Sequence, residues 1–91
     1  MKIYELKFEV RKGESTFSYQ NLFEAKDYED AERLAHKWCC DFYGVKGEQL
    51  DDYTYEFPGA CAVLKIESVL EITDIEEWKE KQYKKAFITI I

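Results

Sequence analysis

The residues of this chain best suited to chemistry are its single histidine and three cysteines. His36 and Cys40 are four positions apart, so on a helix they share one face and their side chains can reach a common metal ion. A structural zinc site takes four ligands and usually includes a C-x2-C pair, which this sequence lacks. We therefore expect Cys39 and Cys61 to be small buried residues, with His36 and Cys40 on the surface. A metal site at His36 and Cys40 is the alternative.

Catalytic groups are hard to find elsewhere in the chain. Cys40 is predicted near the C-terminal end of a helix, where the dipole disfavours a thiolate and His36 only partly offsets this. Adjacent acidic pairs at 29–30, 51–52 and 76–77 fall at predicted helix starts or in a turn, where capping and solvation explain them. Phosphate-loop, G-x-S-x-G, H-E-x-x-H and EF-hand patterns do not occur. The sequence thus indicates a non-catalytic protein without a cofactor.

Length and charge set the class of protein. A chain of 91 residues makes one domain, here residues 1–91, and its seven Tyr, six Phe and two Trp favour a folded core. The net charge of −6 argues against nonspecific nucleic-acid binding, and the basic segment 79–85 is typical of an exposed helix end. No signal-peptide or membrane-spanning run is seen, and the odd number of cysteines makes no disulfide framework. We expect a cytoplasmic protein that does not enter a membrane.

Periodicity predicts two strands and a helix in the first half. Residues 3–10 alternate apolar and charged side chains, as in a half-buried strand, and a turn at 11–14 leads into a second strand over 15–25. Asp27 is suited to cap a helix over 28–43 that ends before Gly44. The helical wheel directs Ala31, Ala35, Trp38 and Phe42 to the core, with Glu29, Arg33, His36 and Cys40 opposite.

The second half repeats this order. A third strand is predicted over 52–57, and Pro58 with Gly59 makes a turn. A fourth strand over 61–72 directs Ala62, Leu64, Ile66, Leu70 and Ile72 inward, with Ser68 as the position that suits a bulge. Thr73 and Glu76 form a T-x-x-E capping box for a helix over 74–84. The apolar end, 87–91, is expected to pair as a fifth strand or pack on the core.

These elements predict an α+β fold. We expect a mainly antiparallel sheet of four to five strands, with one long and one short helix on one face, in the order β-β-α-β-β-α(-β). Residues 23–32 and 70–79 match at Glu24/Glu71, Asp27/Asp74 and Glu29/Glu76, which suggests duplicated ββα halves 1–44 and 45–91. Independent convergence at two helix starts, where acidic residues are favoured, is the alternative.

An aromatic sheet surface supplies the leading functional hypothesis. Tyr19, Tyr53 and Tyr55 are expected on an exposed sheet face, where Tyr is enriched at binding surfaces. The sequence therefore favours a small acidic protein-binding or regulatory domain whose partner is another protein or a second copy. Two alternatives remain. One is an acidic inhibitor of the phage or mobile-element type that mimics nucleic acid, and the other is a metal- or thiol-dependent protein using His36 and Cys40.

Overall fold

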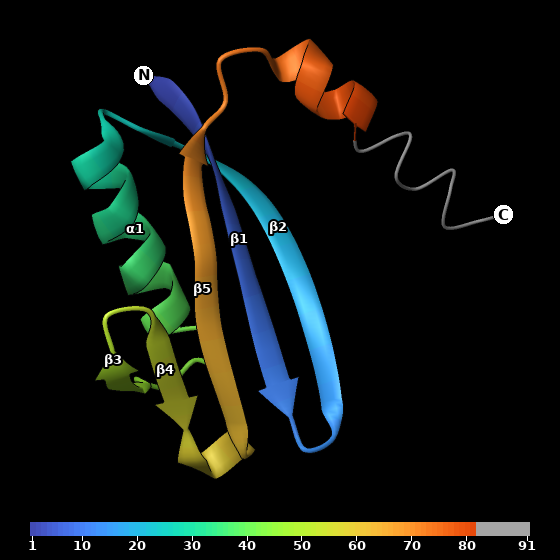
Figure 1. Ribbon diagram of the computed structural model, residues 1–91. Helices are drawn as coiled ribbons and strands as arrows, with labels where there is room; N and C mark the ends of the chain where they lie inside the picture. Colours follow the sequence, from blue (N-terminus) through green and yellow to red (C-terminus); the bar gives the residue numbers. More distant parts are fainter. Residues whose placement is uncertain (82–91) are drawn as a thin grey trace, which may run out of the picture.

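A five-stranded antiparallel sheet forms the body of the protein, in the spatial order β2-β1-β5-β4-β3 (Figure 1). The structure is a computed structural model that describes residues 1–81. Its strands are β1 (Lys2–Lys12), β2 (Ser15–Ala25), β3 (Glu48–Asp51), β4 (Thr54–Phe57) and β5 (Ala62–Glu71). Helix α1 (Tyr28–Cys40) follows β2, a 3-10 turn (Pro58–Ala60) joins β4 to β5, and residues 75–81 are helical. This confirms the α+β class and the antiparallel sheet.

The hairpin of β1 and β2 follows from the alternation of β1. Tyr4, Leu6, Phe8 and Val10 are buried on the face that α1 covers. Gly13, at φ +63°, adopts the left-handed conformation that a two-residue turn between Lys12 and Ser15 requires. The two strands then pair along their full length, from Lys12 opposite Ser15 to Lys2 opposite Ala25.

Helix α1 begins as predicted and rests on small residues. The N–H of Asp30 donates to Oδ1 of Asp27 at 2.8 Å, so Asp27 is the N-cap. The helix ends at Cys40, before the predicted residue 43. The side chains buried against the sheet are Ala31, Ala35 and Cys39. Trp38, predicted to face the core, is instead 47% exposed, because the small residues bring the helix axis close to the sheet and leave no room beneath it for an indole.

A bulge in β5 changes which side chains face the core. Lys7 pairs with Ser68 but Phe8 pairs with Ile66, so Glu67 is an extra residue beside the predicted bulge position. The insertion reverses the alternation beyond it. Val69 is therefore buried, and Leu70, predicted to face inward, is 54% exposed on the opposite face.

The fifth strand is not the one expected from the sequence. The predicted third strand, 52–57, is β4, and the extra strand β3 lies between the predicted helix 28–43 and this strand, where the sequence predicted no strand. β3 pairs with β4 at the edge of the sheet. The predicted strand at 87–91 and the end of the predicted helix 74–84 lie outside the described residues.

The second helical segment meets the other face of the sheet. Asp74, rather than Thr73, accepts the capping bond, from the N–H of Glu77 at 3.0 Å. The indole Nε1 of Trp78 donates to the carboxylate of Glu5. Glu5 alternates with Tyr4 and Leu6 and so points away from α1. The sequence predicted both helices on one face, whereas Trp78 contacts the sheet on the face opposite α1.

The structure leaves the internal repeat as a prediction. The matched residues Asp27 and Asp74 are both N-caps. However, the strands that precede them hold different positions, since β2 is an edge strand and β5 lies inside the sheet. Within residues 1–81, no helical stretch has the length and apolarity that a bilayer crossing requires.

Gly47 offers a test of the packing around β4. A Cβ at this position would lie 2.8 Å from the ring of the buried Phe57, so either the ring or the backbone would have to shift. We expect Gly47→Ala to lower the free energy of unfolding by about 1–3 kcal/mol, measured by urea denaturation. The matched control is Gly59→Ala, whose Cβ would meet nothing within 4 Å and which should change stability by less than about 0.5 kcal/mol. Equal effects of the two substitutions would contradict this packing.

Candidate protein-interaction site

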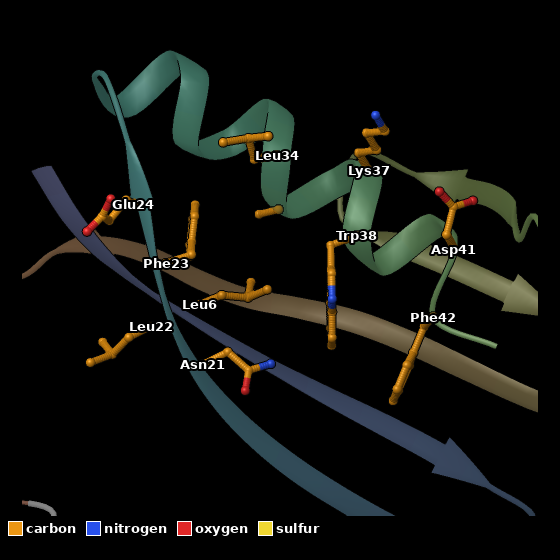
Figure 2. A pocket seen from close by; sticks show the side chains of 11 residues that line it. Leu6, Asn21, Leu22, Phe23, Glu24, Leu34, Lys37, Trp38, Asp41 and Phe42 are labelled. Atoms are coloured by element: carbon orange, nitrogen blue, oxygen red, sulfur yellow. The ribbon is translucent and has the colours of Figure 1, made fainter. Parts of the chain in front are cut away.

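An open groove lies between α1 and β2, and we call it the α1–β2 groove (Figure 2). Its volume is about 740 Å³. The apolar side chains that line it come from β1, β2, α1 and the turn after α1, and they include Leu6, Phe23, Leu34, Trp38 and Phe42. α1 packs on β5 and β2, and Ala25 at the end of β2 is buried, whereas Phe17 and Tyr19 farther along this strand are half-exposed.

Stacked aromatic rings form one end of the groove. The rings of Trp38 and Phe42 stack with centroids 5.4 Å apart, and Phe42 meets the ring of Tyr19 edge-on at 5.8 Å. Tyr19 in turn stacks on the buried ring of Phe8 at 5.0 Å. Such contacts hold the rings in fixed positions, so a partner would lose little side-chain entropy on binding them.

The aromatic surface stays in contact with solvent. Trp38 is 47% exposed, Tyr19 is 40% exposed, and Phe17, two residues before Tyr19 on the same face of β2, is 48% exposed. Lys37 and Asp41 of the helix side and Glu24 of β2 lie at the margin of the groove, as Figure 2 shows. An apolar centre with a charged rim is the usual composition of a protein–protein interface.

The three tyrosines predicted to share a surface lie in two places. Tyr19 borders the α1–β2 groove, whereas Tyr53 and Tyr55 belong to the β4 side of the sheet. Tyr53 is exposed, but Tyr55 is only 5% exposed, so its predicted exposure is wrong. Tyr55 points toward α1, where its hydroxyl shares a 2.6 Å hydrogen bond with Nδ1 of His36. Burial raises the pKa of the Tyr55 hydroxyl, which therefore keeps its proton at neutral pH.

His36 and Cys40 are half-buried and have different partners. Contrary to the prediction that they lie on the solvent face, His36 bonds to Tyr55, and the thiol of Cys40 donates to the carbonyl oxygen of Gly47 at 3.6 Å. Among residues 1–81, no group of three or more His, Cys, Asp or Glu side chains is arranged to hold a metal ion. The geometry therefore gives no support to a metal site at His36 and Cys40.

The cysteines differ in their surroundings. Cys39 is fully buried, as predicted, and burial raises the pKa of its thiol to about 12. Cys61, predicted to be buried, is exposed after the Pro58–Ala60 turn, where it adopts a left-handed conformation at φ +53°. All three thiols are free. A thiol with the high pKa of Cys39 is a poor nucleophile at neutral pH.

Sequence reasoning missed the groove but contained one signal for it. The helical wheel assigned Trp38 and Phe42 to the core. The signal is the composition of β2: residues 15–23 contain no charged side chain, although 35% of the chain is charged. Solvent-exposed edge strands usually carry charges, so an uncharged one points to a covered surface.

Comparison of the chain with protein-family models, with curated proteins and with solved structures finds no match. The functional assignment therefore rests on the geometry of the α1–β2 groove and of the strand beside it.

The buried thiol of Cys39 predicts a loss of stability at alkaline pH. Its pKa rises from an ordinary value of 9.0 to about 12 on folding, so the folded state favours the protonated thiol. The resulting stabilisation is complete below pH 9 and is lost as the pH rises from 9 to 12. Between neutral pH and about pH 10.5, ionisation of this thiol in the unfolded state should lower the free energy of unfolding by about 2 kcal/mol.

Urea denaturation of Cys39→Ala at both pH values measures this contribution. The variant should lose less stability on going to alkaline pH than the wild type does, whatever its stability at neutral pH. Cys61→Ala, which removes an exposed thiol, should behave like the wild type. Equal alkaline losses in all three proteins would show that the Cys39 thiol does not titrate as its burial implies.

Proposed function

We propose that this chain is a small, non-catalytic domain that binds protein through the α1–β2 groove. The observation that carries the proposal is an aromatic cluster in which the exposed Trp38 and Tyr19 are held in place by ring contacts with the partly buried Phe42. Trp and Tyr in such positions supply much of the binding energy at protein interfaces. An exposed apolar groove of this kind on a small domain typically marks an interaction site.

The strand beside the groove favours a polypeptide as the occupant. Within residues 1–81, β2 is an edge strand of eleven residues, and no other described strand pairs with the outer side of its backbone. A polypeptide lying along β2 can bond to the N–H and C=O groups of that side while its side chains enter the groove, which is the arrangement of β-strand addition. A small molecule would fill the groove but leave the edge of β2 unpaired.

No specific observation supports either alternative function. A nucleic-acid mimic needs carboxylates gathered on one surface, whereas the face of the sheet opposite α1 mixes both signs. Glu9 of that face pairs across the strands with Lys65, and Lys7 lies 3.8 Å from Glu5. The thiol alternative rests on Cys40, whose thiol bonds to Gly47.

A photo-crosslinking residue can test the proposal in cells of the native host. Placed at Lys37, on the rim of the groove, it should form covalent adducts with a protein, and Trp38→Ala in the same chain should remove them. The matched control is the same residue at Lys65, an exposed lysine on the opposite face of the sheet, which should give none of these adducts. Circular dichroism and urea denaturation verify that each variant is folded.

Identification of the adducts by mass spectrometry decides the result. Adducts formed at position 37, absent at 65 and dependent on Trp38 support protein binding at the groove, whether the captured chain is another protein or a second copy. If position 37 captures nothing beyond what position 65 captures, the groove is not a protein-binding site and the proposal is wrong.

A further inference from the structure

Among the described residues 1–81, no strand pairs with the outer edge of β2, and over residues 15–23 this edge lacks the features that keep edge strands from pairing. Natural edges carry charged side chains, Pro, bulges or a short length. β2 has eleven residues in unbroken register with β1, and residues 15–23 contain neither a charge nor a Pro. At the other edge, β3 has only four residues, two of them acidic, in the sequence Glu-Gln-Leu-Asp. The two edges of the sheet thus differ sharply in how open they are to strand pairing.

The hairpin fixes which residues of β2 present their backbone outward. Lys12 and Ser15 close a two-residue turn and so exchange hydrogen bonds across the hairpin. Hydrogen-bonded and non-hydrogen-bonded positions then alternate along the strand. The backbone groups of the even-numbered residues from 16 to 24 therefore point away from β1. An added antiparallel strand would bond to these positions.

We infer that a second copy of this chain occupies this edge, with β2 of each copy paired antiparallel about a two-fold axis at Gln20. This inference rests on the proposed function, since it names the partner that pairs with β2 beside the α1–β2 groove. The pairing is isologous, so each copy supplies the same surface. It joins the two sheets into one and leaves both α1 helices on the same face.

The length of β2 and the charges at its two ends favour a second copy as the partner, paired in this register. With the axis at Gln20, Ser15 lies opposite Ala25 of the partner subunit, so the two strands overlap over their whole length. Just beyond the overlap, Glu14 lies opposite Lys26 of the partner subunit, and the two-fold axis repeats this pair of opposite charges. A register centred on Tyr19 would instead place Glu14 opposite Glu24 of the partner subunit twice. Like charges directly opposite each other destabilise a strand pair.

The same register also brings aromatic side chains of the two copies together. Phe17 lies opposite Phe23 of the partner subunit at a non-hydrogen-bonded position, where facing side chains are closest. These residues are on the α1 side of the sheet, since Phe23 lines the groove and Phe17 alternates in step with it. The two α1–β2 grooves then face each other across the axis, and the half-exposed Phe17 gains an aromatic neighbour.

Analytical ultracentrifugation of the full chain tests the pairing. The wild type should sediment as a dimer that dissociates on dilution. Gln20→Lys places two lysines opposite each other at the axis and should weaken dimerisation at least tenfold. Gln49→Lys is the matched control, because it introduces the same charge on the other edge strand, β3, and should leave dimerisation unchanged.

A charge exchange tests the register. Glu14→Lys turns two attractive pairs into repulsive ones and should weaken the dimer by about three- to tenfold, and adding Lys26→Glu should restore it. In the register centred on Tyr19, Glu14→Lys would instead strengthen the dimer. Strengthening by Glu14→Lys, or a dimer insensitive to Gln20→Lys, would overturn the inference.

A monomeric wild type would also overturn it, and the crosslinking result separates the two conclusions. If the monomer still captures a different protein at position 37 in a Trp38-dependent manner, the proposed function stands and only the identity of the partner is wrong. If the monomer captures nothing there, both proposals fail.

Discussion

A single helix is narrower than the sheet it covers, and this mismatch shapes the surface of the protein. Strands in a sheet lie about 4.8 Å apart, so five strands span about 19 Å, whereas a helix with its side chains is about 10 Å wide. α1 is the one helix that the structure places on this face within residues 1–81. It closes the core over β1, β5 and β4, where Leu6, Leu64 and Tyr55 are buried. Phe17 and Tyr19, on the same face of β2, are left half-exposed.

The small residues of α1 make the mismatch larger. Ala31, Ala35 and Cys39 allow the helix to approach the sheet closely, which improves packing directly beneath it but prevents large side chains from entering. Trp38 therefore lies on the flank of the helix, and its ring stacks with that of Phe42 in the turn after α1 and meets the ring of Phe8 edge-on. The groove is thus a direct consequence of how the core is filled.

Local patterns predicted the parts of the fold that depend on local physics. The alternation of Tyr4, Leu6, Phe8 and Val10 and the N-cap at Asp27 were readable because strand burial and helix capping involve residues close in sequence. Leu70 was misplaced because a bulge exchanges the two faces of a strand beyond it. The prediction continued the same alternation past the bulge position. β3 was missed because its short polar sequence has no alternation.

The candidate site was predicted less well than the fold because its geometry depends on contacts distant in the sequence. The local sequence predicts that Tyr55 is an exposed tyrosine on a strand. Its burial depends on α1, which brings His36 to its hydroxyl. The helical wheel predicts that Trp38 is a core residue. Its exposure depends on the short distance between helix and sheet, which the small residues of α1 set. Only the absence of charge in residues 15–23 was visible in the sequence, and its meaning depended on finding that β2 is an edge strand.

The distribution of charge links the groove to the acidic character of the chain. Two copies with a net charge of −6 repel each other wherever their acidic surfaces approach. Along residues 15–23 two copies can meet without bringing charged side chains together, and Glu14 and Lys26, which have opposite charges, flank this stretch. The same stretch carries the half-exposed Phe17 and Tyr19, whose burial would favour association. The β2 edge therefore combines a stretch without charged side chains with exposed aromatic surface, and both properties favour self-pairing.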